Sequence, residues 1–252
     1  MAKIIAIGMK KGGPGKSTIA LNLAGVFANR GKKVAIWDCD TNHTCISFLN
    51  KRAAYRNRIE KEGLTLSKVP YIKPESKLPE NFLIDDLEQA EDDYDYIIID
   101  TGGYENDAFK DAVTKADFIY LPFIPSDADI EQLVPTLKVV LQIEGNIRRA
   151  IGNKEYKKEI RLLISRVTYN ARAAFQEARE KVKDLIDYTS ISSATIPEYG
   201  KIRKLYSDGL TLSDTDARGK KDPKRAVFEL LADEIDGIRQ VQYKRGEGYA
   251  ED

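Results

Sequence analysis

The residues best suited to chemistry lie near the N-terminus, in the segment MKKGGPGKST of residues 9–18. Its glycines and the three residues after them form one candidate set: Gly12, Gly13, Gly15, Lys16, Ser17 and Thr18. Backbone N–H groups of a glycine-rich turn that opens a helix bind phosphate oxygens well. The lysine after the turn adds a charge for the β- and γ-phosphates, and the two hydroxyls serve Mg²⁺ and the α-phosphate. The segment therefore predicts a nucleotide phosphate loop rather than a plain strand-to-helix turn.

Three aspartates stand where two apolar segments end. Asp38 and Asp40 close KKVAIWDCD, and Asp100 closes YDYIIID. The carboxyl ends of parallel strands meet at one edge of a sheet, where a Mg²⁺–nucleotide complex needs acidic side chains. The i, i+2 spacing predicts Asp38 and Asp40 on one face of a strand, so that one can attend the ion while the next orients water. Taken alone, either of them would be typical of a turn or a helix cap.

Alternating apolar and amphipathic segments must position these residues. Strands are predicted at residues 3–8, 32–40, 64–72, 94–100, 117–125, 159–167 and 190–197, with a loop at 73–81. Helices are predicted at residues 17–31, 44–62, 82–93, 107–116, 129–145, 171–188 and 223–242. This order predicts an α/β fold: a single-domain, doubly wound, mostly parallel sheet with helices on both faces, over residues 1–242. Residues 243–252 are polar and contain glycine, and we expect them to be frayed.

Composition narrows the possible function classes. Forty Lys and Arg balance forty Asp and Glu, so no overall field draws the chain to nucleic acid or membrane. Two cysteines without a CxxC pair, and a single histidine, argue against a zinc or iron–sulfur site and for buried or inert thiols in a reducing cytosol. The apolar N-terminal run stops at Gly8, which favours a first strand over a signal peptide, and no window of about 18 apolar residues predicts a membrane span.

The phosphate loop carries a second lysine, Lys11, before its glycines. The ordinary Walker A pattern GxxxxGK[ST] fails at its first glycine, where this chain has Lys10. The form KGGPGKST of residues 11–18 is instead similar to the deviant Walker A motif of the ParA/MinD family of P-loop ATPases. The resemblance implies ATP and Mg²⁺ as cofactors, and a homodimer that sandwiches two ATP molecules. It also implies that Lys11 reaches the partner's nucleotide and offsets phosphate charge, which would make dimerisation depend on nucleotide; a solvated loop lysine is the alternative.

The aspartates fit the same resemblance. Asp38 and Asp40 resemble the family's DxDPQ segment, although Thr41 and Asn42 replace its Pro and Gln, and Asp100 resembles its Walker B aspartate. The implied Mg²⁺ residues are Ser17, Asp38 and Asp100, and the implied catalytic residues are Lys11, Lys16 and Asp40.

Basic residues gather in the C-terminal third. Residues 145–225 hold 19 Lys and Arg against 11 Asp and Glu, a net charge of +8. The candidate DNA-contacting residues are Lys201, Arg203, Lys204, Arg218, Lys220, Lys221, Lys224 and Arg225. Similarity to ParA implies sequence-independent binding of the ATP dimer to nonspecific DNA through phosphates, with each dimer doubling the patch. An ordinary solvated surface is the alternative.

The leading hypothesis is a DNA-partitioning ATPase similar to the short ParA form, cytoplasmic and nucleoid-associated. Slow hydrolysis would release it from DNA, and a ParB-like centromere-binding protein would stimulate that hydrolysis. A MinD-like membrane-associated positioning ATPase needs a basic amphipathic C-terminal helix, whereas residues 226–241 interleave acidic and apolar residues, which favours a core-packed helix and no membrane. A conjugative-transfer helper ATPase stays open, as does a dethiobiotin-synthetase-like ligase, which would carry substrate-specific residues in place of Lys11.

Overall fold

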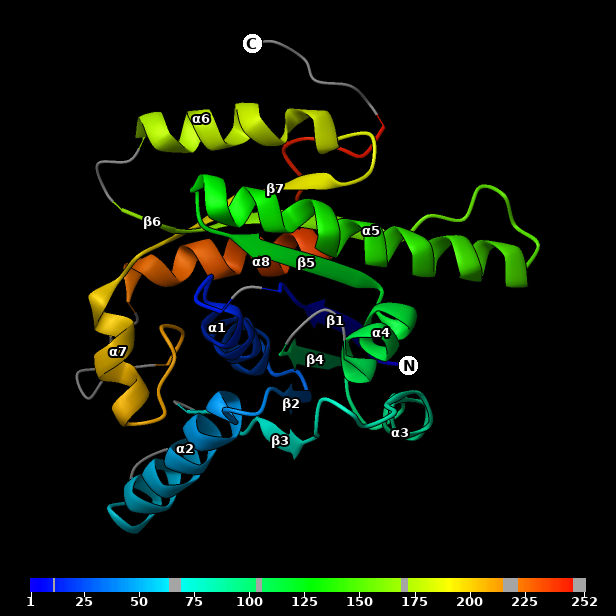
Figure 1. The fold of residues 1–252 in the computed structure, drawn as a ribbon. Helices are drawn as coiled ribbons and strands as arrows, with labels where there is room; N and C mark the ends of the chain where they lie inside the picture. The colour runs from blue at the N-terminus through cyan, green and yellow to red at the C-terminus, as the bar shows by residue number, and fades with distance from the viewer. Residues whose placement is uncertain (11, 64–68, 103–105, 169–171, 215–221, 247–252) are drawn as a thin grey trace.

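A parallel sheet forms the centre of the molecule (Figure 1). The computed structural model describes residues 1–10, 12–63, 69–102, 106–168, 172–214 and 222–246. Over these residues it shows one seven-stranded sheet of order β3-β2-β4-β1-β5-β6-β7, with every neighbouring pair parallel. The strands are β1 (Lys3–Ile7), β2 (Val34–Cys39), β3 (Lys73–Ser76), β4 (Tyr96–Thr101), β5 (Phe118–Phe123), β6 (Glu159–Val167) and β7 (Ser190–Pro197). The predicted doubly wound α/β sheet is confirmed.

Helices cover both faces of this sheet (Figure 1). The α-helices of the described residues are α1 (Lys16–Asn29), α2 (Thr44–Lys61), α3 (Ile84–Ala90), α4 (Asp107–Lys115), α5 (Asp127–Ala150), α6 (Arg172–Val182), α7 (Gly200–Ser207) and α8 (Ala226–Ile235). Short 3₁₀ turns follow α6 (η2, Lys183–Leu185) and precede α8 (η3, Pro223–Arg225). Helices α3 to α6 pack on one face, and α1, α2, α7 and α8 pack on the other. None of these helices has the combination of length and apolar character that crossing a membrane requires.

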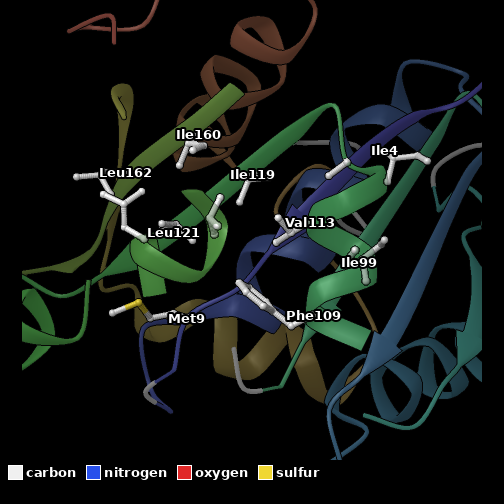
Figure 2. Close-up of a cluster of buried hydrophobic side chains, with 14 of the residues drawn as sticks. Ile4, Met9, Ile99, Phe109, Val113, Ile119, Leu121, Ile160 and Leu162 are labelled. Carbon is white, nitrogen blue, oxygen red and sulfur yellow. The ribbon is translucent and has the colours of Figure 1, made fainter. Parts of the chain in front are cut away.

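The central strands supply both hydrophobic cores by alternation. In β1, Ile4 and Ala6 belong to the core under α4 and α5, whereas Ile5 and Ile7 belong to the core under α1. Figure 2 shows the first of these cores, where Phe109 and Val113 of α4 pack against strand side chains. Because strands buried on both faces carry apolar residues at nearly every position, they appear in sequence as continuous runs. This explains why these strands were predictable.

The third strand is the clearest difference from the sequence prediction. The strand occurs at Lys73–Ser76, inside the segment predicted as a loop, and not at 64–72, of which 64–68 lie outside the described residues. Val69 and Ile72 are buried in advance of the strand and account for its apolar signature. Among the described residues the strand pairs with β2 alone, so its side chains are half-exposed, and an edge position tolerates Pro74.

The C-terminal segment also differs from the prediction. The helix predicted over 223–242 ends at Ile235, and Gly237 follows with a φ of 73°. The chain then returns to the free edge of β7, where the Ile191 N–H donates to the Tyr243 carbonyl oxygen at 2.9 Å. Arg245 forms two hydrogen bonds to the buried carboxylate of Glu144, at 2.6 and 3.0 Å. The prediction of a frayed tail is therefore wrong for residues 243–246, which cover a sheet edge that would otherwise be open; residues 247–252 lie outside the described residues.

Candidate functional site

The predicted phosphate loop joins β1 to α1 at the carboxyl edge of the sheet. Gly13 and Gly15 have φ values of 104° and 86°, a left-handed region that favours glycine, and Gly15 is the N-cap of α1. No side chain of the described structure caps the first turn of α1. The backbone N–H groups at that helix terminus are therefore available to an anion such as a phosphate.

The side chains after the loop point toward the sheet edge. Lys16 is 8% exposed, and the hydroxyl of Ser17 bonds the carboxylate of Asp100. Thr18 lines a cavity beside the loop. The loop residues Gly12, Gly13, Gly15, Lys16, Ser17 and Thr18 are thus gathered at the end of β1 as predicted from the motif, whereas Lys11 lies outside the described residues.

Asp38 and Asp100 lie side by side at the ends of β2 and β4, where they are partners in the parallel register. Both are completely buried. Asp38 accepts backbone hydrogen bonds from Asp40 at 3.1 Å and from Ile46 at 3.0 Å. Asp100 Oδ2 accepts a hydrogen bond from the Cys45 thiol at 3.2 Å, whereas Asp100 Oδ1 has no hydrogen-bond partner among the described residues.

Burial makes both of these charges unfavourable. It raises the pKa of Asp100 to about 7, with a further increase from the charge of Asp38 and an opposing decrease from the Ser17 hydrogen bond. Burial likewise raises the pKa of Asp38, while the N–H groups of Ile46, Asp40 and Cys45 oppose the change. Two buried carboxylates in register are therefore poised to gain from a nearby cation.

The donor set fits Mg²⁺. Two carboxylates and the hydroxyl of Ser17 supply hard oxygen ligands, and the unpartnered Oδ1 of Asp100 leaves one oxygen for the ion or for a water bound to it. Within the described part of the chain, His, Cys, Asp and Glu side chains do not gather in threes as a self-contained metal site. Mg²⁺ sites in nucleotide-binding proteins use few protein ligands and complete their shell with phosphates and water.

Asp40 occupies a different position from the one predicted. Strand β2 ends at Cys39, so the alternation that would place Asp40 on the face of Asp38 stops one residue short. Asp40 instead begins a turn in which its carbonyl oxygen accepts the N–H of His43, and Asn42 donates two hydrogen bonds to its Oδ1, both at 2.9 Å. His43 has a φ of 47°, which turns the chain into α2. Asp40 remains next to the carboxylate pair and is half-buried.

A cavity of about 260 Å³ adjoins the phosphate loop. The loop and α1 form one wall, and the ends of β6 and β7 with α7 form the other. The Arg166 guanidinium crosses it, donating to the Gly13 carbonyl oxygen at 2.9 Å and to Glu198 at 3.1 Å. Arg166 has a φ of 54°, which is uncommon for a residue with a side chain. The position and size of this cavity suit the nucleoside part of a nucleotide.

Sequence reasoning missed Arg166, Glu198 and Tyr199 as site residues. The signal was present, because each residue lies near the carboxyl end of a predicted parallel strand, where ligands of doubly wound sheets bind.

Among the predicted basic residues that the structure describes, some are exposed and others contact groups of the same chain. Arg203 and Lys204 are exposed on α7, and Arg203 also lines the cavity. Lys201 pairs with Asp222 at 2.6 Å, and Arg225 pairs with Glu229 at 2.8 Å. The ammonium of Lys224 lies 4.0 Å from the centre of the Tyr199 ring. The remaining predicted residues, Arg218, Lys220 and Lys221, lie outside the described residues.

Comparison with known proteins places this site in a family. The family described as ATPase MipZ matches residues 3–234. The septum site-determining protein MinD of Helicobacter pylori is 26% identical over 98% of this chain and 96% of its own length. Protein ParA of Rhizobium radiobacter is 25% identical over 60% of this chain, and the match covers 61% of that relative, less than two thirds of its length.

Two solved structures have the same fold. An ATP complex of a Cyanothece McdA variant superposes with a TM-score of 0.67 at 18% identity, covering 95% of this chain and 98% of that one. The structure of pNOB8 ParA bound to nonspecific DNA superposes with a TM-score of 0.58 at 15% identity. With a parallel sheet, a deviant phosphate loop and a paired carboxylate site in place, and with the family matching nearly the whole chain, the protein belongs to the MipZ family of ParA/MinD-type P-loop ATPases.

Proposed function

We propose that this ATPase is a DNA-partitioning switch: Mg²⁺–ATP drives formation of a sandwich homodimer, the dimer binds nonspecific DNA, and hydrolysis releases it. The observation that carries the proposal is the phosphate loop set directly against the buried Asp38–Asp100 pair, with Asp100 Oδ1 unpartnered among the described residues. This arrangement supports an ATP site whose charge balance changes when nucleotide and Mg²⁺ arrive together.

The chemistry follows from the positions of the side chains. The N–H groups from Gly13 to Lys16 would cradle the β-phosphate, Lys16 would offset charge on the β- and γ-phosphates, and Thr18 would serve the α-phosphate. Ser17, Asp38 and Asp100 would hold Mg²⁺, directly or through water. The bound ion supplies charge stabilisation for phosphoryl transfer.

Asp40 would orient the water that attacks the γ-phosphate. It lies beside the ion site but outside β2, in a turn held by Asn42 and His43. A carboxylate in a turn can adjust to the γ-phosphate, whereas Asp38 is fixed by the hydrogen bonds to its side chain from the backbone N–H groups of Asp40 and Ile46. Asp40→Ala should therefore retain ATP binding and lose hydrolysis.

The DNA contacts need a narrower set of residues than the sequence predicts. Lys201, Lys224 and Arg225 already contact groups of the same chain. Arg203 and Lys204 are exposed, and the ion pair of Arg203 with Glu198 is long, at 3.9 Å. They are therefore the described residues best placed for DNA phosphates, together with Arg218, Lys220 and Lys221 of the segment outside the described residues. The DNA-bound ParA structure has the same fold and supports this proposal. A ParB-like partner would stimulate the hydrolysis that ends DNA binding.

A MinD-like membrane-associated switch is the second candidate, because MinD of Helicobacter pylori matches over 98% of this chain. The C-terminal helix disfavours it. Phe228, Leu231 and Ile235 of α8 are buried in the core formed with α1, so the apolar face that a lipid surface would need is already occupied. A conjugative-transfer helper would share both the ATP switch and the DNA affinity.

Sedimentation analysis tests the switch. Wild type should be a monomer without nucleotide and a dimer with Mg²⁺–ATP. After ATP is added, the Asp40→Ala dimer should persist for longer than the wild-type dimer. Lys11→Ala should stay monomeric with ATP, whereas Lys10→Ala, which changes the adjacent loop lysine, should dimerise normally. A wild-type chain that binds ATP but stays monomeric at all concentrations would contradict the proposal.

A further inference from the structure

The thiol of Cys45 lies beside the Asp100 carboxylate of the proposed ion site without belonging to any motif of the phosphate loop or the strand ends. Cys45 is in the first turn of α2 and is completely buried. Its Sγ is 3.2 Å from Asp100 Oδ2 and 3.9 Å from the Ser17 carbonyl oxygen. It therefore connects α2 to α1 and to β4, two of the elements that form the site.

The thiol contributes, together with the Ser17 hydroxyl, to the orientation of the Asp100 carboxylate. Oδ2 of the carboxylate accepts a hydrogen bond from the thiol, and Oδ1 has no hydrogen-bond partner among the described residues. Rotation of the carboxylate would break the thiol contact. The neighbouring residue acts in the same way, because the Ile46 N–H holds Asp38 Oδ2 at 3.0 Å. The first turn of α2 thus orients both buried carboxylates.

We propose that Cys45 is a positioning residue for Mg²⁺: its S–H fixes the Asp100 carboxylate so that Oδ1 faces the ion. The inference rests on the Mg²⁺–ATP site of the proposed function. Groups that orient metal ligands through hydrogen bonds change metal affinity by about 10–100-fold when they are removed. A thiol is a weak donor, so the lower end of that range is expected.

The chain offers a matched control in its other cysteine. Cys39 is also a free thiol and completely buried, but it belongs to the core on the opposite face of the sheet. Cys39→Ala removes the same sulfur atom from a similarly buried position. Cys39 is the register partner of Thr101, next to Asp100, and its removal takes no hydrogen bond from the Asp100 carboxylate.

The test is a Mg²⁺ titration of the binding of a fluorescent ATP analogue, followed by equilibrium fluorescence. Cys45→Ala should raise the Mg²⁺ midpoint about tenfold, and Cys45→Val, which fills the volume but donates nothing, should do the same. Cys45→Ser restores a donor and should stay within about twofold of wild type, as should Cys39→Ala. Affinity for the nucleotide in EDTA should be the same in all five proteins, which separates an effect on the ion from an effect on the loop.

The outcomes distinguish the two proposals. Mg²⁺-dependent binding in wild type with an unchanged midpoint in both Cys45→Ala and Cys45→Val would overturn the role of Cys45 and leave the proposed function intact. Equal shifts in Cys45→Ala and Cys39→Ala would also overturn it, because they would indicate a packing effect. Nucleotide binding by wild type that does not respond to Mg²⁺ would contradict the proposed function itself.

Discussion

The carboxyl group of Asp100 shows how a single residue couples binding to stability. It is buried beside Asp38 in the sheet register, and burial raises its pKa from 3.8 to about 7. Charging it in the folded protein is therefore costly until a cation is bound. Burial of Asp100 beside Asp38 destabilises the charged pair when no cation is present, and it favours the binding of Mg²⁺ with a nucleotide.

The pH dependence of stability follows from that shift. Because the folded-state pKa lies above the unfolded value, the contribution of Asp100 to stability is complete below about pH 3.8 and is lost as pH rises through about 7. Without Mg²⁺ and nucleotide, the free energy of unfolding should fall between pH 5 and pH 8, by an amount on the order of 2–4 kcal/mol. Asp38, whose pKa is also raised by burial, acts in the same direction.

Asp100→Asn tests this at the level of the residue. In EDTA the variant should lose less unfolding free energy than wild type between pH 5 and pH 8, and it should gain no nucleotide affinity from Mg²⁺. Urea denaturation at both pH values measures the first effect. Asp208→Asn, at an exposed aspartate, is the control and should follow wild type. Parallel pH profiles for wild type and Asp100→Asn would show that the buried charge has no such cost.

Particular residues show how much of the site the sequence predicts. The phosphate loop and Asp38 with Asp100 could be predicted because they are local motifs attached to buried strands. Arg166 and Glu198 lie near the carboxyl ends of predicted strands, but no local motif marks them. Arg166 contacts Gly13 of the loop from β6, 153 residues away in the chain, and Glu198 contacts Arg166. Asp40 was predicted as the last residue of a strand, whereas β2 ends at Cys39 and Asp40 lies in the turn that follows.

At the scale of elements, helix α2 is held in place at its first turn and at its middle. Its first turn contacts the carboxylate pair, and its middle carries Arg52, whose buried guanidinium forms two hydrogen bonds to Asp214 at 2.6 and 2.8 Å. The turn at Gly209 packs on the same helix: a Cβ there would lie 2.1 Å from the Arg52 backbone nitrogen. The position of α2, and with it the orientation of the ion site, depends on this close contact.

Gly209→Ala tests that dependence against a matched control. Gly209 and Gly152 both have a φ of 66°, but a Cβ at Gly152 would meet nothing within 4 Å. Gly152→Ala should cost about 1–2 kcal/mol of unfolding free energy from backbone strain alone. Gly209→Ala should cost at least about 2 kcal/mol more, because the added atom collides with the backbone of α2. Equal losses in chemical denaturation would mean that the turn does not fix the helix.

The elements that were not predicted from the sequence, β3 and α7, have no fully buried side chain. Strand β3 has four residues and is at the edge of the sheet that the described residues form, and its pattern is polar because its side chains are only partly buried. Helix α7 is short and has no fully buried residue, so its basic composition looked like a surface run. Buried strands appear as continuous apolar runs and long helices have a clear periodicity. Their presence could therefore be predicted well, with errors mainly at the ends of α5 and α8.

For the whole molecule, the order of the strands brings distant segments to one edge of the sheet. Strands β2, β4 and β1 lie next to one another, which sets Asp38 and Asp100 beside the loop after β1. Helix α7 follows β7 and places Arg203 at the nucleotide cavity. Arg203, a residue of the proposed DNA surface, therefore lines the cavity beside the phosphate loop. If a nucleotide occupies this cavity, its binding and the binding of DNA can influence each other.

In the proposed switch, ATP and not ADP makes this chain bind DNA. We would first measure co-sedimentation with nonspecific duplex DNA at low and physiological salt, with ATP, ADP or no nucleotide. The comparison includes wild type, Asp40→Ala and an Arg203→Ala/Lys204→Ala double variant, with anionic lipid vesicles in a parallel series. Retention on DNA with ATP alone, stronger in Asp40→Ala, weaker in the double variant and reduced by salt, is the predicted result. Binding to vesicles with ATP and to DNA under no condition would contradict the account and favour a membrane-associated switch.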